Sequence, residues 1–364
     1  MKITYPHMGN VCIVIKALLT DLGLELVLPP PTSRRTVELG VRYSHEFACF
    51  PFKLNMGNYL EAYELGADTI LMAGGVGPCR FGYYAQVQQQ ILEDLGVKME
   101  MVVLEPPDVS FHEVKDKILY LIGNISWWQV FKAVRFAWSK ARAIDTIEEK
   151  LLYFRPRVKE PIKLEGYFRE TLKEIDEAAD RREVERVVNS FLKKSEIMPQ
   201  LSMKPLKVGL VGEIFTLLEP FANYDMERRL GLLGVEVTRS VWLSAWINEH
   251  LCRGLLRVRT ECSDDKKLAA PYLNSFVGGH GVETVGCTVG FAQRNYDGVI
   301  QLAPLTCMPE IVAHSVFPAV SEDYQIPLLT FYLDELSGEA GLQTRLEAFV
   351  DLISAYSRKK EGVL

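Results

Sequence analysis

In the first part of the chain, short apolar runs typical of buried strands alternate with segments whose apolar residues have helical spacing. The alternation covers the first 104 residues. It predicts a parallel sheet with helices on both faces. Strands are expected at residues 2–5, 24–28, 68–73 and 98–104, and helices at residues 11–23, 32–39, 52–65 and 83–95.

The middle of the chain has a different pattern. Residues 131–152 and 161–194 carry closely spaced charges of both signs at helical intervals. Such spacing is typical of the solvated faces of long helices. Pro106 and Pro107 end the alternation, and no strand of comparable quality is expected before residue 205. We therefore predict a helical insertion or linker over residues 105–204, with no chemistry of its own.

The strand and helix alternation returns between residues 205 and 345. The predicted fold class is α/β, with two doubly wound parallel-sheet domains of the Rossmann or flavodoxin type at residues 1–104 and 205–345, and a C-terminal helix at 346–364. Strands are expected at residues 206–214, 235–239, 297–303 and 326–333, and helices at 221–233, 242–253, 308–320 and 341–357, with another beginning after Gly278.

Composition limits the classes of partner. The chain has 364 residues, 48% of them hydrophobic and 24% charged, as in globular proteins. A formal net charge of −6 gives no basic excess to neutralise phosphates, so no nucleic-acid partner is expected. No secretory signal and no run of 18 apolar residues is found, which predicts a cytoplasmic protein without a membrane span.

Three of the seven cysteines share one context. Cys49 precedes a predicted helix, and Cys79 and Cys307 each lie between a predicted strand and a helix. Ligands of open α/β sheets bind at the carboxyl ends of strands, and a helix N-terminus favours a thiolate. Thiolates so placed suit an iron–sulfur cluster. The separations of 30 and 228 residues are unlike short ferredoxin motifs, so structural or reactive thiols are an equal alternative.

The loop that carries Cys79 is rich in glycine. Residues 74–82 lack the Gly-Lys-Ser/Thr ending of a phosphate-binding loop, so no nucleotide site is predicted. Glycines such as Gly77 would instead let backbone N–H groups approach a cluster. Arg80 would neutralise a reduced cluster or an acidic substrate, or would pair with a carboxylate.

Several motifs together resemble one protein family. They are Phe50-Pro51-Phe52-Lys53, residues 77–84, residues 304–310 and residues 334–341. These stretches resemble the iron–sulfur subunits of 2-hydroxyacyl-CoA dehydratases and benzoyl-CoA reductases. The nearest branch comprises CoA-activase-like proteins related to double-cubane cluster proteins. The resemblance covers residues 1–104 and 205–355, but not the charged middle.

The resemblance implies a cluster in the cleft between two domains, with Cys49, Cys79 and Cys307 as ligands. The cluster would be of the 4Fe–4S type or, as an alternative, an 8Fe–9S double cubane. A double cubane needs more ligands, for which Cys287 and Cys262 are the candidates. Three ligands to a single cubane would leave one iron open to substrate.

The resemblance also implies partners and a reaction. Electrons would come singly from an actin-like, ATP-hydrolysing iron–sulfur activator, since this chain has no recognisable ATPase segment. The chain would reduce or dehydrate a small substrate as a homodimer or as a heterodimer with a sister subunit. Dehydratases of this kind bind acyl-CoA, although no motif here can be tied to CoA.

Two further residues are candidates for acid–base chemistry. His280 lies in a Gly-His-Gly loop, and histidine titrates near neutral pH. Glu213 follows a predicted strand. The alternative for each is hydrogen bonding to local backbone groups. Two other functions remain open at this stage: a non-catalytic electron-transfer or scaffold subunit, and a cluster-free protein that binds an anionic metabolite.

Overall fold

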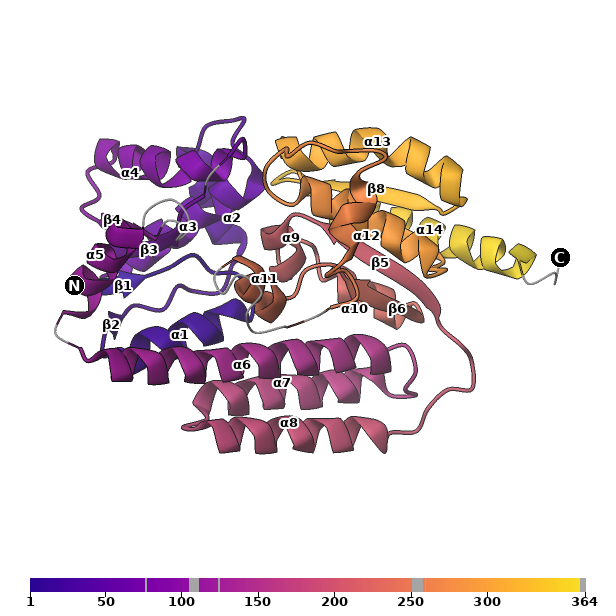
Figure 1. Ribbon diagram of the computed structural model, residues 1–364, viewed down its shortest axis with the longest axis horizontal. Coiled ribbons are helices and arrows are strands. Elements are labelled where there is room, and N and C mark those ends of the chain that lie inside the picture. The colour runs from indigo at the N-terminus through magenta and orange to yellow at the C-terminus, as the bar shows by residue number, and fades with distance from the viewer. Residues whose placement is uncertain (76, 105–110, 124, 251–257, 259, 361–364) are drawn as a thin grey trace.

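The computed structural model describes residues 1–75, 77–104, 111–123, 125–250, 258 and 260–360. Val76 of the glycine-rich loop, Pro106, Pro107 and Cys252 lie outside the described residues, as does the end of the helix expected to reach Arg253. Two four-stranded, all-parallel sheets flanked by helices make up the two halves of the molecule (Figure 1). The prediction of a two-sheet α/β fold is therefore confirmed.

The N-terminal sheet has the strand order β2-β1-β3-β4, with Ile3 of β1 opposite both Leu26 and Thr69. Helix α3 is buried from Phe50 to Ala62, because Gly40 and Gly57 let it lie directly against α2. The elements are β1 (Lys2–Thr4), α1 (Val11–Asp21), β2 (Glu25–Leu26), α2 (Arg34–Tyr43), α3 (Phe50–Glu64), β3 (Thr69–Ala73), the short 3₁₀ helix η1 (Arg80–Tyr83), α4 (Tyr84–Asp94) and β4 (Glu100–Leu104).

The C-terminal sheet has the order β6-β5-β7-β8, so its strands follow one another in space as those of the first sheet do. The elements are β5 (Leu206–Gly212), α9 (Ile214–Leu218), α10 (Met226–Leu232), β6 (Val235–Arg239), α11 (Leu243–His250), the 3₁₀ helix η2 (Asp265–Ala269), α12 (Gly281–Gln293), β7 (Gly298–Pro304), α13 (Met308–Tyr324), β8 (Leu328–Leu333) and α14 (Glu339–Lys360).

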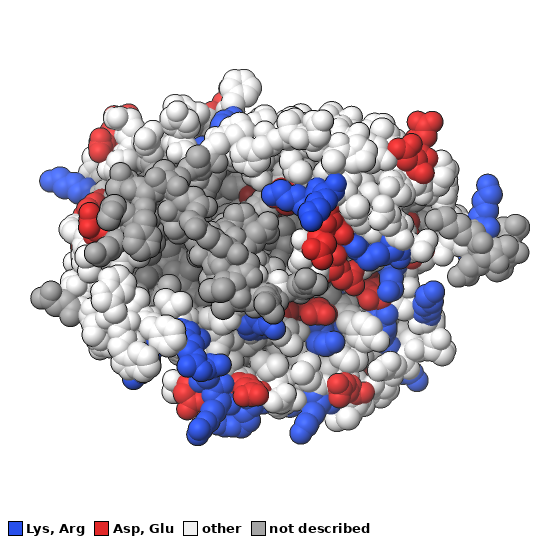
Figure 2. All heavy atoms as spheres, in the orientation of Figure 1, with Lys and Arg blue, Asp and Glu red and all other residues white. Residues whose placement is uncertain are grey.

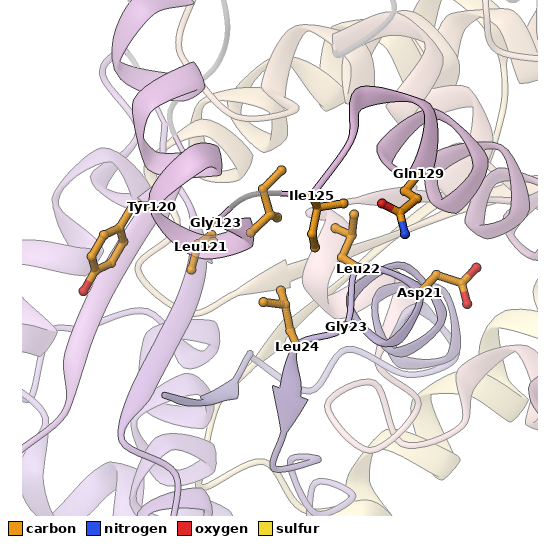
Figure 3. Close-up of a pocket in the computed structure, with 10 residues that line it drawn as sticks. Asp21, Leu22, Gly23, Leu24, Tyr120, Leu121, Gly123, Ile125 and Gln129 are labelled. Atoms are coloured by element: carbon orange, nitrogen blue, oxygen red, sulfur yellow. The ribbon is translucent and has the colours of Figure 1, made fainter.

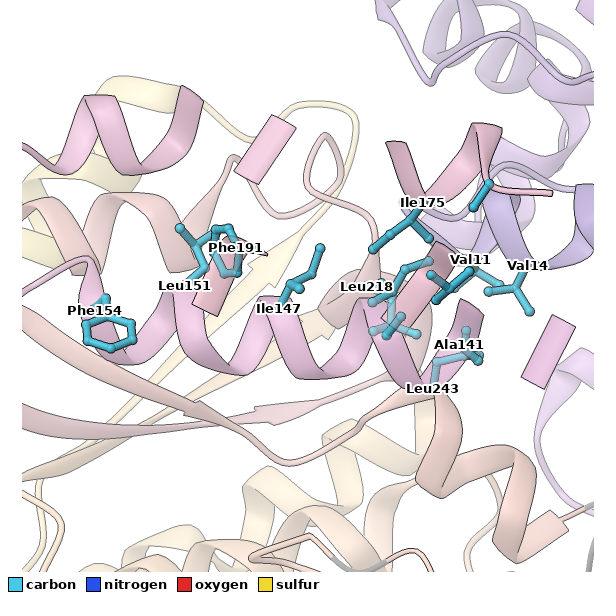
Figure 4. Packing of buried hydrophobic residues seen from close by; sticks show 14 of the residues in the cluster. Val11, Val14, Ala141, Ile147, Leu151, Phe154, Ile175, Phe191, Leu218 and Leu243 are labelled. Carbon is cyan, nitrogen blue, oxygen red and sulfur yellow. The ribbon is translucent and has the colours of Figure 1, made fainter. Parts of the chain in front are cut away.

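The middle of the chain forms α5 (Phe111–Ile122), α6 (Trp127–Phe154), α7 (Pro161–Glu177) and α8 (Arg181–Glu196). Helices α6, α7 and α8 lie side by side beneath both sheets (Figure 1). Their apolar faces join one cluster with α1, α9 and α11, drawn in Figure 4. Ile147 and Phe191 are fully buried in it, and each contributes about 2 kcal/mol of burial free energy. The insertion therefore packs against both α/β domains.

Many charged side chains of the insertion are exposed, although those of Lys140, Asp145, Arg155 and Glu165 are buried. Lysine and arginine lie among aspartate and glutamate along the lower edge of the face shown in Figure 2, over α6, α7 and α8. Mixed charge of this kind is typical of a solvated helix surface. None of the helices in the described part of the chain combines the length and apolar character needed to cross a bilayer.

Candidate metal centre

Cys49, Cys79 and Cys307 each stand immediately before a helix. Cys49 is the N-cap residue of α3, Cys79 that of η1 and Cys307 that of α13. All three have extended backbones, and a proline stands in the first turn of both α3 and α13. Proline fits the first turn because its missing N–H would have no partner there. One backbone N–H group near each helix start, of Phe52, Phe81 or Glu310, favours the thiolate of its cysteine by lowering the thiol pKa.

Arg80 connects the loops that carry these three cysteines. Its guanidinium donates to the carbonyl oxygen of Phe47 at 2.9 Å and to that of Thr306. Thr306 has a left-handed backbone, with φ of 67°, and its Oγ1 also donates to the Phe47 carbonyl, at 3.2 Å. Phe47 lies two residues before Cys49, and Thr306 directly precedes Cys307. The three segments therefore meet around one arginine, although Thr306 is 226 positions from Arg80 and 259 from Phe47.

A second loop of the C-terminal domain covers Cys79. A Cβ at Gly278 would lie 2.6 Å from the backbone nitrogen of Cys79, and one at Gly279 would lie 3.9 Å from its sulfur. The same Gly279 position is 3.2 Å from the ring of Pro309, in the first turn of α13. Both glycines have positive φ, of 81° and 48°. Glycine is favoured at both positions by the positive φ, and at Gly278 a Cβ would also clash with the Cys79 backbone.

The surroundings of the three thiols oppose their ionisation. Burial is the largest cause that raises the pKa of all three, and the charge of Glu213 acts in the same direction. Arg80 and nearby backbone N–H groups lower the pKa values of Cys49 and Cys79. The phenol of Tyr84 forms a hydrogen bond with the Cys49 sulfur. Thiolates at these positions need a cation beside them, since burying an unpaired charge is costly.

The three sulfurs are too widely spaced for one small ion. Among the described residues, only one group of three His, Cys, Asp or Glu ligand atoms lies within 4.8 Å of one another, and it contains none of these cysteines. A zinc ion with bonds of about 2.3 Å would hold its thiolates about 3.8 Å apart. The three thiols therefore do not form a single-ion site in this structure.

The other residues expected at this site lie around it. Glu213 caps α9, where its carboxylate accepts hydrogen bonds from the N–H groups of Phe215 and Thr216 at 2.9 and 3.0 Å. His280 is the N-cap residue of α12 and is partly exposed. Gly77, with φ of 109°, contacts the ring of Phe276 from the C-terminal domain. Glu213 therefore forms the backbone hydrogen bonds that were the alternative to an acid–base role.

Glu310 is a site residue whose importance the sequence does not reveal. From its place in the first turn of α13 it is expected only as a favourable charge. Instead it is fully buried, and it accepts hydrogen bonds from Thr284 Oγ1 at 3.1 Å and from Gln301 Nε2 at 2.8 Å. Burial raises its pKa to about 8, so near neutral pH it is largely a neutral acid that ties α13 to α12.

A second cysteine group lies within the C-terminal domain. The ligand atoms of Cys262, Asp265 and Cys287 all lie within 4.8 Å of one another, and all three side chains are buried. This group could hold a metal ion. The charges that raise the pKa of the Cys287 thiol are those of Cys262, Asp265 and Glu283. None of these three residues is among the main influences on the pKa values of Cys49, Cys79 and Cys307.

The pocket drawn in Figure 3 lies elsewhere. It is formed where α1 leads into β2 and where α5 ends, and Leu24, Tyr120 and Gln129 are among its lining residues. Among the described residues that line it there is no cysteine, and Asp21 is the only acidic one. None of the residues singled out from the sequence contributes to it.

Comparison with models of known protein families and with curated proteins gives no match to this chain. The family resemblance therefore rests on the sequence motifs alone, most of them around Cys49, Cys79 and Cys307. The geometry of the site is independent of that resemblance.

Proposed function

We propose that this chain is an iron–sulfur protein of the 2-hydroxyacyl-CoA dehydratase type, with Cys49, Cys79 and Cys307 as cluster ligands. One observation carries the proposal. Arg80 and the Gly278–Gly279 backbone bring three cysteine loops, from both α/β domains, against one another. Such a boundary is where ligands of paired α/β domains bind.

The donor set fits such a cluster. Three cysteines at helix starts offer thiolates together with backbone N–H groups, which favour negative charge on sulfur. The glycine pair leaves backbone, and no side chain, next to Cys79. The cluster would supply one-electron chemistry at low potential. Its nuclearity, 4Fe–4S or double cubane, is set by how many further ligands the assembled protein provides.

The chain's own residues have separate tasks in this proposal. Arg80 holds the cysteine loops together and places a positive charge beside the sulfurs, which favours added electrons. Tyr84 would donate its phenol O–H to the Cys49 thiolate, which would lower the electron density on that ligand. His280, at the start of α12, would supply a proton to the substrate.

Electrons would come from an ATP-hydrolysing, actin-like iron–sulfur activator, and the working unit would be a homodimer or a heterodimer with a sister subunit. The substrate would be a small molecule, with an acyl-CoA as the first to test. Activation can be followed without knowing the substrate, because the cluster changes its electron paramagnetic resonance signal when it accepts an electron.

Anaerobic purification with iron and acid-labile sulfide analysis tests the proposal. We expect a brown protein with about four irons per chain, or about eight for a double cubane. Addition of an activator, ATP and a reductant should reduce the cluster, and omission of ATP should abolish that reduction. A colourless chain that takes up neither iron nor sulfide after reconstitution would refute the proposal.

A further inference from the structure

The Cys262, Asp265 and Cys287 group lies where a loop meets the side of a helix. Cys262 and Asp265 are joined by a turn in which the Asp265 N–H donates to the Cys262 carbonyl at 3.1 Å. Cys287 lies opposite, near the middle of α12. The ligand atoms of all three converge within 4.8 Å. This spacing matches what one tetrahedral ion with thiolate bonds of about 2.3 Å imposes on its ligands.

Helix α12 is shaped to receive this turn. A Cβ at Gly286 would lie 2.4 Å from the carbonyl oxygen of Asp265, and one at Gly290 would lie 2.0 Å from its carboxylate. Neither glycine has a positive φ, so the reason for glycine here is space and not backbone conformation. Glycine in mid-helix costs about 1 kcal/mol relative to alanine, and two are placed one turn apart to admit the Asp265 segment.

Arg294 completes the charge balance of the group. Its guanidinium donates to both carboxylate oxygens of Asp265, at 3.0 and 2.6 Å. Each carboxylate oxygen has a second lone pair, so Asp265 can also bind a metal. Two thiolates and one carboxylate carry three negative charges, and a divalent ion with one guanidinium carries three positive charges. Without the ion, the two buried sulfurs must remain protonated.

We propose that Cys262, Asp265 and Cys287 bind one Zn²⁺ ion at a site separate from the cluster centre. Cysteine and aspartate are ordinary zinc ligands, and water would fill the fourth tetrahedral position. Arg294 orients the Asp265 carboxylate from outside the coordination shell. The ion fastens the 262–265 turn to α12, whose first residue follows the glycine loop that covers Cys79. This site does not depend on the proposed cluster.

Metal analysis of the purified chain tests the site directly. We expect about one zinc per wild-type chain after dialysis against metal-free buffer. C262S and C287S should lose nearly all of it, and the partly buried Cys12 provides the matched control, C12S, which should keep it. R294K should weaken zinc binding by about 10- to 100-fold, as is typical when a residue that orients a ligand is changed.

Cobalt provides a measurement that does not depend on variants that fold poorly. The wild-type chain, stripped with a chelator and titrated with Co²⁺, should show thiolate-to-cobalt charge-transfer absorption that added Zn²⁺ abolishes. Stripping should also lower the thermal midpoint of unfolding, and Zn²⁺ should restore it. No zinc in the wild type together with no cobalt–thiolate absorption would overturn the proposal. A Cys262–Cys287 disulfide, seen as a mass two daltons lower in the untreated chain, would also overturn it.

Crossed analysis separates this site from the cluster. C79S should lose iron and keep zinc, whereas C287S should lose zinc and keep iron. A chain with zinc but no iron would contradict the proposed function alone. Loss of both metals in C287S would contradict the separation of the two sites, because it would make Cys287 a cluster ligand.

Discussion

The two α/β domains have the same strand order, and they place different chemistry at equivalent positions. Cys79 follows β3 and Cys307 follows β7, which are corresponding strands of the two sheets. Cys49 precedes the helix before β3, and His280 precedes the helix before β7. The N-terminal domain thus offers two thiols where the C-terminal domain offers one thiol and one imidazole. The shared topology places reactive side chains at equivalent positions, and the residue type at each position determines its chemistry.

The domains also differ in how they approach each other. The N-terminal domain contributes Arg80, a long donor, whereas the C-terminal domain contributes glycines and backbone carbonyls. Around the three cysteines the boundary is therefore asymmetric, with the charge on the N-terminal side and the close backbone approach on the C-terminal side. Elsewhere the C-terminal domain also supplies charge, since Glu335 pairs with Lys53 and Glu219 with His7. Four substitutions test this comparison, described from the largest expected effect to the smallest.

Replacement of Gly278 by alanine should have the largest effect. The new Cβ would lie 2.6 Å from the Cys79 backbone nitrogen, and φ of 81° is unfavourable for alanine. Strain and overpacking together should cost about 2–5 kcal/mol in the free energy of unfolding, and iron content should fall. Urea denaturation measures the first effect. Gly96 has a similar φ of 70° with no atom within 4 Å, so G96A isolates the backbone cost. Equal losses in both variants would contradict the predicted contact.

Replacement of Arg80 by alanine should have the next largest effect. The Phe47 and Thr306 carbonyls each lose a charged donor, which should cost about 1–3 kcal/mol and loosen the three cysteine loops. Iron retention during dialysis against a chelator is the measurement. R80K keeps the charge but cannot reach both carbonyls as the guanidinium does, so it should lie between wild type and R80A. Wild-type retention in R80A would show that the arginine does not hold the loops.

Glu310 gives a prediction about pH. Its carboxyl keeps a proton up to about pH 8 in the folded chain, whereas in the unfolded chain it loses the proton near its ordinary pKa of 4.5. The folded state therefore binds more protons between these values, and stability should fall as pH rises through this window, by roughly 1–3 kcal/mol. E310Q should flatten that fall. Urea midpoints at pH 5 and pH 8 measure the fall in both proteins. An equal fall in wild type and E310Q would contradict the interpretation of Glu310 as a buried neutral acid.

His280 gives the smallest predicted effect. H280A should keep its iron, because the proposal makes His280 a proton donor and not a ligand, although it stands where the other domain has Cys49. H280N tests whether a hydrogen-bonding side chain that cannot transfer a proton is sufficient for substrate turnover. Substrate turnover should fall in both variants while reduction by the activator is unchanged. Loss of iron in H280A would contradict this role, because it would make His280 a cluster ligand like Cys49 at the equivalent position of the other domain.

The sequence predicts the sheets well because buried parallel strands have distinctive apolar runs. The strand expected at residues 235–239 coincides with β6, and the class of fold is confirmed. The strand expected to reach residue 214 ends instead at Gly212, whose φ of 140° turns the chain into α9, a short helix that the sequence did not indicate. A five-residue helix carries too little periodicity to be recognised.

The cysteine contexts could be read from the sequence, but the contacts between them could not. The hydrogen bond of Arg80 to Thr306 joins residues 226 positions apart, and only the packing of the two domains brings them together. The partnership of Cys287 with Cys262 depends on space left by Gly286 and Gly290. Mid-helix glycines carry no sign of what fills that space. The sequence therefore offers Cys262 and Cys287 only as further ligands of the cluster, and gives no sign that they form a separate group with Asp265.

The claim at the centre of this account is that both domains hold one cluster. Iron content of C307S, purified anaerobically and reconstituted beside wild type and the C12S control, tests it most directly. Cys307 is the single ligand that the proposal takes from the C-terminal domain, so C307S should lose most of its iron while C12S keeps all of it. Full wild-type iron and an unchanged spectrum in C307S would contradict the account.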